Sequence, residues 1–162
     1  MREKLIRNLL QYIKENNPEL LHQMENEAAL MQWLSDKVKG VITLADQMKK
    51  KRQPEYIIEE ACMEELTKSL RPSKFNYIHH ILEEEFEADY VRMTHSGVLH
   101  FEIINLIQCC GSTFDDLRFA EENEDNRFTR YAITGVIKEY LEENRAEETR
   151  SHALQQPAEI HR

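Results

Sequence analysis

Apolar residues recur at intervals of three and four along most of the chain, and this spacing constrains its fold more than any other feature. Side chains spaced in this way share one face of an α-helix, because the helix turns through about 100° per residue. The chain has only four glycines and four prolines among 162 residues, whereas the turns of a β-rich protein use such residues repeatedly. The sequence therefore predicts an all-α protein, a single-domain multihelical bundle of six to eight helices.

Capping residues and helix breakers give approximate limits for this bundle, and Ser73, directly after Pro72, is the expected N-cap of the helix over 73–90. We expect one helical domain over residues 1–145 and a polar, disordered tail over 146–162. The longer predicted helices cover 2–16, 27–51, 54–70, 73–90, 98–110 and 126–144. Gly40 interrupts the apolar stripe of the second of these, so we expect another helix to cross closely there. The last helix is expected to bury Phe128, Tyr131, Ala132, Ile137, Tyr140 and Leu141.

The net charge of −9 is distributed unevenly. Residues 1–52 carry ten Lys or Arg and seven Asp or Glu, a balance of +3, and residues 53–162 carry eleven and twenty-three, a balance of −12. A nucleic-acid-binding protein usually has a basic face, so nucleic acid is disfavoured as a partner. The basic run Lys49, Lys50, Lys51 and Arg52 is the candidate phosphate contact, although it also suits the solvated end of a helix.

The three cysteines, Cys62, Cys109 and Cys110, do not form a disulfide framework, since they are odd in number and two are adjacent. They indicate structural thiols in a reducing compartment. The N-terminal stretch lacks the unbroken apolar core of a signal peptide, and no segment has the roughly 20 apolar residues of a membrane span. We therefore expect a cytoplasmic protein without membrane contact.

The stretch HHILEEEFEAD, residues 79–89, concentrates histidines and acids and is the candidate site of the sequence. On a helical wheel its buried arc contains Phe75, Ile78, Ile81, Leu82 and Phe86. His80, Glu84 and Glu87 fall on the opposite side and should face solvent. Glu85 and Asp89 fall among the apolar positions, where an unpaired charge costs several kcal/mol.

Two interpretations of these inward acids remain open. In the first, Glu85 pairs with an arginine, a lysine or a helix N-terminus of a neighbouring helix. In the second, Glu85 and Asp89 line a cation site, with His79 and Glu83 at its edge. The chain has no HExxH motif, and only Glu19-Leu-Leu-His22 has the Glu-x-x-His spacing of di-iron bundles. Phosphate-binding glycine loops and catalytic motifs are also absent from the sequence, so we expect no metal, no cofactor and no enzymatic activity.

Residues 62–86, CMEELTKSLRPSKFNYIHHILEEEF, resemble a domain-of-unknown-function family carried by bacterial conjugative transposons. The resemblance lies in Leu66 and Leu70, the Ser73-Lys74-Phe75-Asn76 junction, and the apolar pairs that end in Glu85-Phe86. Residues 134–144, TGVIKEYLEEN, are similar to the family's C-terminal helix, and Cys62 stands where the family usually has Ala. The resemblance implies a helical fold without a known activity, associated with genes for DNA-handling proteins such as helicases and methylases.

These observations lead to three hypotheses about function. The first is a non-enzymatic, helical protein-interaction module, accessory to mobile-element or DNA-processing machinery, which binds a basic protein partner or forms a homodimer. The second is a weak nucleic-acid-associated protein that uses residues 49–52. The third is a metal-dependent enzyme built on His79, Glu83, Glu85 and Asp89.

Overall fold

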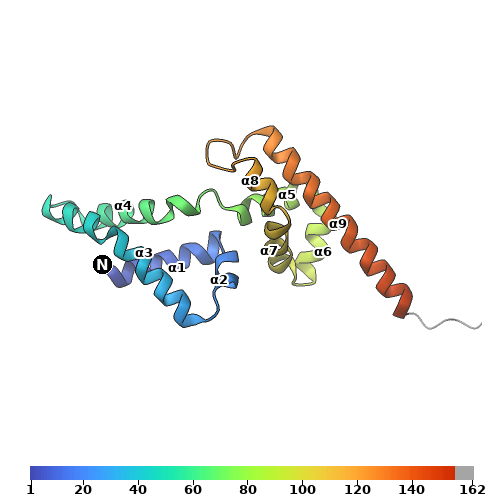
Figure 1. Cartoon of the computed structure of the whole chain (residues 1–162), viewed down its shortest axis with the longest axis horizontal. Coiled ribbons are helices and arrows are strands. Elements are labelled where there is room, and N and C mark those ends of the chain that lie inside the picture. Colours follow the sequence, from blue (N-terminus) through green and yellow to red (C-terminus); the bar gives the residue numbers. More distant parts are fainter. Residues whose placement is uncertain (156–162) are drawn as a thin grey trace, which may run out of the picture. The chain divides into compact units, whose positions relative to one another are not determined.

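The computed structural model describes residues 1–155, and this part of the chain consists of helices and connecting turns (Figure 1). No strand occurs within residues 1–155, which confirms the all-α prediction. The same residues form nine α-helices and one short 3₁₀ helix, more than the six to eight predicted. None of the helices described is both long and apolar enough to cross a membrane.

The chain divides into two compact units, with the boundary between Tyr77 and Ile78. This division corrects the expectation of a single-domain bundle. The apolar stripes that predicted one core are instead buried in two separate sets, one in each unit.

The first unit is built around three mutually packed helices, α1 (Arg2–Asn16), α3 (Glu27–Lys50) and α4 (Glu55–Thr67). The short helix α2 (Glu19–Gln23) connects α1 to α3, and the 3₁₀ helix η1 (Lys68–Leu70) follows α4 (Figure 1). Each long helix contributes one apolar stripe to the core, as predicted. These buried residues are Leu5, Leu9, Ile13, Leu34, Val38, Val41, Ala45, Ile58, Cys62 and Leu66.

Polar contacts fix the angle between α1 and α4 at the rim of this core. Glu59 of α4 accepts a hydrogen bond from Asn8 Nδ2 at 2.6 Å and pairs with Lys4 Nζ at 2.9 Å. The hydrogen bond and charge of Lys4, together with the hydrogen bond from Asn8, lower the pKa of Glu59. Both contacts lie at the partly exposed rim of the core, so they orient the helices more than they stabilise them.

The N-terminus of α5 (Lys74–Glu85) is attached to the end of α1 by side chains of the first unit. Ser73 Oγ accepts a hydrogen bond from the Asn76 backbone N–H at 3.0 Å, which confirms its predicted role as a helix cap. The Ser73 hydroxyl also donates to the carbonyl oxygen of Asn16, and Asn76 Nδ2 donates to Asn16 Oδ1 at 2.9 Å. The Ser-Lys-Phe-Asn junction therefore closes the first unit where α1 ends.

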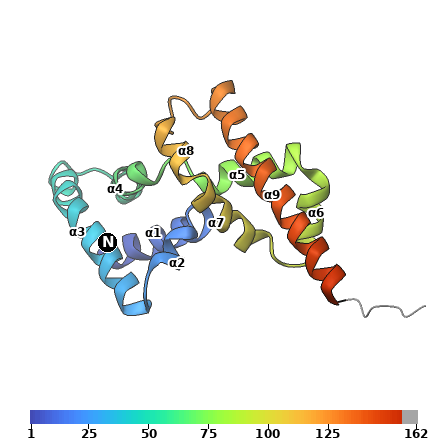
Figure 2. The same cartoon turned by 45° about the vertical axis from the view of Figure 1, so that its right-hand side comes forward.

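The second unit contains α6 (Glu87–His95), α7 (Leu99–Cys109), α8 (Gly111–Asp116) and α9 (Arg127–Gln155), together with most of α5. α9 lies against α7 and α8 and reaches α5 and α6 through side chains (Figure 2). Its core residues are Ile78, Ile81, Leu82, Met93, Ile103, Ile104, Leu106, Cys110, Phe114, Ile133, Ile137 and Leu141. The second unit therefore has an apolar interior of its own.

The helix predicted over 73–90 is interrupted at Phe86, which separates α5 from α6. Phe86 has φ −133° and ψ 50°, outside the helical region, and its side chain is half-buried instead of buried as predicted. Positions after Phe86 therefore do not follow the wheel of α5. Asp89 belongs to a different helix from Glu85.

The last helix differs from its prediction in length and in orientation. α9 continues to Gln155, so residues 146–155 of the predicted tail are helical, and residues 156–162 of that tail lie outside the described residues. Phe128 and Tyr131 are exposed, at 77% and 63%, whereas they were predicted to be buried. Ile137 and Leu141 are buried as predicted, and Ile133 is the third residue of the buried stripe.

Gly40 is exposed on α3, and a Cβ atom added there would meet nothing within 4 Å. The expected close crossing of another helix at this position is therefore wrong. Glycine inside a helix costs about 1 kcal/mol relative to alanine, since it loses more backbone entropy on folding.

We predict that Gly40→Ala raises the free energy of unfolding of the first unit by about 0.5–1 kcal/mol. Urea denaturation followed by circular dichroism measures the change. A loss of stability would contradict the open environment of Gly40.

Candidate functional site

Three acids of residues 79–89 form ion pairs with α9, namely Glu84, Glu85 and Asp89, whereas the candidate Glu83 pairs with His79 on α5. Glu85 Oε1 lies 3.2 Å from Arg130 Nη2, and Glu84 Oε2 lies 2.7 Å from the same nitrogen. The prediction that Glu85 meets a base of another helix is confirmed. Both carboxylates are about half exposed, at 49% and 50%, so Glu85 lies at the edge of the core and not within it.

Arg130 is the shared partner of this first ion-pair group. Partial burial of the guanidinium disfavours its charge, but the hydrogen bonds from Arg130 to Glu85 and Glu84 outweigh this effect and raise the pKa of Arg130. Two carboxylates close to one another repel, and a single guanidinium between them offsets that repulsion. The group is therefore a structural link between α5 and α9.

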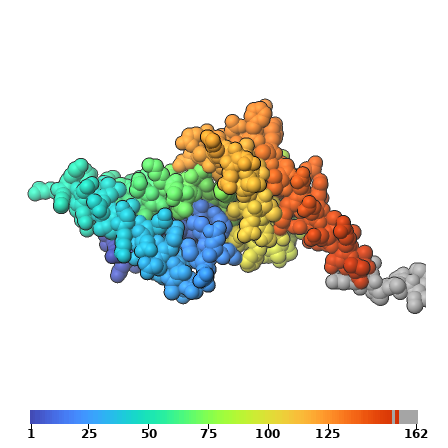
Figure 3. Space-filling view, in the orientation of Figure 1, coloured from blue at the N-terminus to red at the C-terminus, as the bar shows by residue number. Residues whose placement is uncertain are grey.

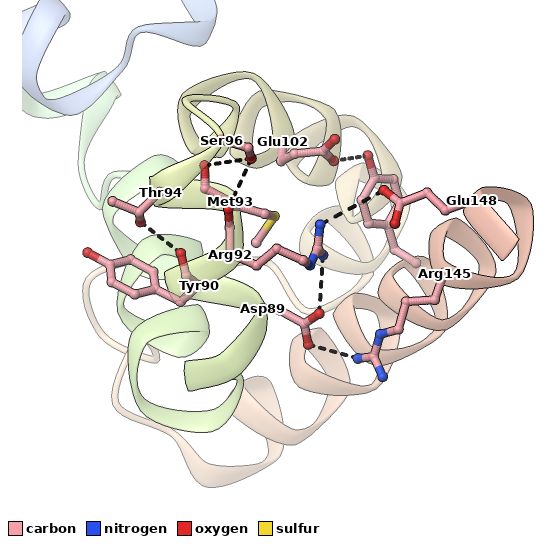
Figure 4. A network of polar contacts seen from close by, with 10 residues as sticks. Asp89, Tyr90, Arg92, Met93, Thr94, Ser96, Glu102, Arg145 and Glu148 are labelled. Atoms are coloured by element: carbon pink, nitrogen blue, oxygen red, sulfur yellow. Dashed lines mark hydrogen bonds and ion pairs between the residues drawn. The ribbon is translucent and has the colours of Figure 1, made fainter. Parts of the chain in front are cut away.

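Asp89 is the buried acid of the stretch, with an exposed fraction of 8%. Its side chain points from α6 toward α9 and lies between two arginines (Figure 4). Asp89 Oδ1 is 3.2 Å from Arg92 Nη2, and Asp89 Oδ2 is 2.8 Å from Arg145 Nη2. Each carboxylate oxygen therefore has its own cationic donor, which offsets the cost of burying the charge.

Glu148 extends this second group, because its carboxylate lies 3.9 Å from Arg92 Nη1 (Figure 4). Arg92, Arg145 and Glu148 are all substantially exposed, with side-chain exposures of 45%, 54% and 69%. The carboxylate of Asp89 is thus buried, whereas the charged side chains around it reach the solvent. It links α6 to the C-terminal half of α9.

Glu85 and Asp89 are directed to different places on α9. Their partners Arg130 and Arg145 are fifteen positions apart, which is about 22 Å along an α-helix. The two carboxylates are therefore drawn toward separate cations and not toward one shared ligand. This arrangement favours the first of the two interpretations of the inward acids.

The histidines of the stretch make local contacts along α5. His79 Nδ1 lies 3.8 Å from Glu83 Oε2, and His80 Nε2 lies 2.8 Å from Glu84 Oε1. The ring of His79 also makes an edge-to-face contact with Tyr90, at 5.4 Å between centroids. Within the part of the chain that the structure describes, no group of three or more His, Cys, Asp or Glu is placed to hold a metal ion.

A third polar contact joins α7 to α9. Tyr140 donates its hydroxyl proton to Glu102 Oε2 at 2.5 Å. Burial raises the pKa of the Tyr140 phenol because it disfavours the charged phenolate. The hydrogen bond to the Glu102 carboxylate, and its negative charge, raise this pKa further. Tyr140 therefore stays protonated as a donor.

Glu19, the first residue of α2, is a half-buried acid of the first unit. Burial raises the pKa of its carboxyl group, while hydrogen bonds from the backbone and from Asn17 oppose the shift. Its Oε2 atom is buried without a hydrogen-bond partner. His22, the other member of the Glu-x-x-His spacing, is exposed at the end of this five-residue helix.

The basic run lies at the turn between α3 and α4, and all four of its side chains are exposed. Lys49 and Lys50 occupy the last turn of α3, where cations interact favourably with the helix dipole. Arg52 adopts a left-handed conformation with φ 56°, and its backbone N–H donates to the Lys49 carbonyl at 2.9 Å. Lys49, Lys50, Lys51 and Arg52 are thus presented together on one exposed turn.

The cysteines are free thiols. Cys62 and Cys110 are buried and Cys109 is exposed. Burial raises the pKa of Cys62 and raises that of Cys110 to about 12. The two buried thiols are therefore held in their protonated, unreactive form.

Sequence reasoning missed the two arginines of α9 that neutralise the acids. Arg130 could have been found, because it falls three positions before Ile133, within the stripe that the helix buries. Arg145 could not, because it follows the predicted end of the helix at 144. Its role depends on the continuation of α9 to Gln155.

We expect the Asp89–Arg145 pair to be coupled more strongly than the Glu84–Arg130 pair, because Asp89 is buried and Glu84 is half exposed. Double-mutant cycles with alanine should give about 1 kcal/mol for the first pair and at most about 0.5 kcal/mol for the second. At high salt only the coupling of Asp89 should persist, since buried charges are screened less. Equal coupling energies would show that burial of Asp89 adds nothing.

Glu19 should make stability depend on pH. The pKa of Glu19 is higher in the folded than in the unfolded chain. The folded state therefore loses stability as the pH rises from the unfolded-state pKa through the folded-state pKa. Glu19→Gln should therefore stabilise the first unit at neutral pH, by up to about 1 kcal/mol, and the gain should vanish below about pH 4. Glu25→Gln, at an exposed position, is the control in the same denaturation series and should show no such trend.

Comparisons with models of protein families, with curated proteins and with solved structures find no match to this chain.

Proposed function

We propose that this chain is a non-enzymatic, all-helical protein-interaction module. The observation that carries the proposal is the exposure of Phe128 and Tyr131 on the outer side of α9. Aromatic side chains are enriched in protein interfaces, because burying them removes a large apolar area from water. Their exposure is consistent with a surface that a partner covers.

The charged groups of the second unit support the same proposal. The inward acids Glu85 and Asp89 are paired with arginines, and these pairs join helices. Both oxygens of Asp89 are paired with arginines, and Oε1 of Glu85 is paired with Arg130. We therefore propose that both acids serve to join helices of the second unit.

The resemblance of residues 62–86 to a family carried by conjugative transposons supports a more specific role. We propose that the chain is an accessory to mobile-element or DNA-processing machinery and that it contacts a protein of that machinery. The free and buried thiols of Cys62 and Cys110 are consistent with a cytoplasmic location.

A second candidate function is weak binding of nucleic acid by the basic turn. The observation in its favour is that Lys49, Lys50, Lys51 and Arg52 are all exposed on one turn. Four cations can neutralise only a few phosphates, so this binding would be weak and would fall steeply with salt.

Affinity purification of the full chain from its native host distinguishes the two functions. We expect one protein to co-purify reproducibly, in a stoichiometric amount that is unchanged by nuclease treatment. A matched variant in which residues 49–52 are all replaced by Gln should retain this partner. Loss of the partner after nuclease treatment or in the Gln variant, together with salt-dependent DNA binding by the unmodified chain, would favour the second function.

A further inference from the structure

The N-terminal half of α9 has an exposed apolar face that points away from the core of its own unit. Phe128 and Tyr131 lie roughly opposite the buried stripe of Ile133, Ile137 and Leu141 on the helical wheel. Neither ring contributes to the apolar interior, since 77% of Phe128 and 63% of Tyr131 are exposed. The fold therefore gives no packing reason for aromatic residues at these two positions.

Gly135 lies on the same face, one turn after Tyr131. It is exposed, and a Cβ atom added there would meet nothing within 4 Å. Its φ is not in the left-handed region, so the backbone does not need glycine at this position. The missing side chain leaves the helix backbone open to close approach beside the aromatic pair. Phe128, Tyr131 and Gly135 together are called the α9 docking face below.

The surroundings of the α9 docking face are acidic. The acidic segment EENED, residues 121–125, precedes α9 and is separated from it by Asn126. The side chain of Asn126 accepts a hydrogen bond from the Phe128 backbone N–H at 2.8 Å. Figure 3 shows this segment and the start of α9, in orange, on the visible surface. Arg127 and Lys138 are exposed cations close by, and Arg130 is already paired with Glu84 and Glu85. Residues 121–139 still carry five Asp or Glu against three Lys or Arg. Glu122 and Asp125 are exposed a few residues from Phe128.

The charge of the whole second unit indicates the sign of the partner. Residues 78–162 carry eight Lys or Arg and eighteen Asp or Glu, a balance of −10, whereas residues 1–77 carry thirteen and twelve, a balance of +1. A second copy docked through its own α9 would bring two acidic segments together, which is unfavourable. A basic partner would gain from the same field in its rate of association.

We propose that the α9 docking face binds a basic amphipathic segment of a partner protein. An apolar side chain of that segment packs against Phe128 and Tyr131, and its backbone passes over Gly135. Its lysines or arginines face residues 121–125. This inference rests on the proposed function, since it names the surface and the chemistry of the protein partner.

Binding of a defined peptide tests the proposal. The probe is a fluorescein-labelled amphipathic peptide of leucine and lysine, compared by fluorescence anisotropy with a peptide in which glutamate replaces every lysine. We expect the lysine peptide to bind the full chain at least about tenfold more tightly. Phe128→Ala with Tyr131→Ala should weaken its binding by about tenfold while the circular dichroism spectrum stays unchanged.

Matched variants separate the docking face from general attraction between opposite charges. Gly135→Gln should weaken peptide binding, whereas Gly40→Gln, at an exposed helical glycine of the first unit, should not. Glu122→Gln with Asp125→Asn should weaken binding more than Glu142→Gln with Glu143→Gln, which remove the same charge about 16 Å or more beyond Tyr131 along α9. Equal effects of the paired variants, or equal binding of the two peptides, would overturn the proposal.

A photo-crosslinking amino acid in place of Tyr131, with Tyr56 as the exposed control position, then tests the surface in the native host. We expect position 131 to crosslink the co-purifying partner through a segment rich in Lys or Arg, and position 56 not to do so. A crosslink to a second copy of the chain at position 131 would overturn the basic-partner proposal. If a protein co-purifies equally with the Phe128→Ala, Tyr131→Ala variant, the docking face is wrong and the interaction module stands; if no protein co-purifies, the proposed function itself fails.

Discussion

The second unit depends on α9, because one side of this helix supplies both apolar contacts and the cations that neutralise buried acid. Ile133, Ile137 and Leu141 enter the core, and Arg130 and Arg145 reach α5 and α6 from the same helix. A hydrophobic stripe alone permits a helix to slide or rotate by small amounts. Directional ion pairs at two places about 22 Å apart favour one position of the helix over its neighbours.

The same two contacts explain why the acids of residues 79–89 do not gather at one point. Glu85 pairs with Arg130 and Asp89 pairs with Arg92 and Arg145, and the break at Phe86 places Glu85 and Asp89 on different helices. The histidines pair with acids one turn away on α5. Charge density in a sequence indicates a site only when the fold directs the charges to one point, and here the fold directs them to several.

The outer side of α9 carries aromatic residues that do not take part in the packing of the second unit. Two aromatic rings and a glycine that the backbone does not require share that side, beside an acidic segment. The first unit has its own core of α1, α3 and α4 and a nearly balanced charge, so the acidic character of the protein belongs to the second unit. The proposed interaction therefore uses the second unit, which carries both the exposed aromatic residues of α9 and most of the negative charge.

The sequence by itself determined that the chain is helical, that α1, α3 and α4 each bury one apolar stripe, that Ser73 caps α5, and that Glu85 needs a cationic partner. These features follow from helical periodicity, from local hydrogen bonding and from the cost of an unpaired charge, all of which act over a few residues. Only the tertiary structure decided that two cores form instead of one, that α5 ends before Phe86, and that Asp89 is the acid most deeply buried. It also decided the orientation of α9, whose apolar residues cover too much of its circumference for periodicity to select a side. Periodicity states which residues share a face, but which face is buried depends on the neighbouring helices that cover it.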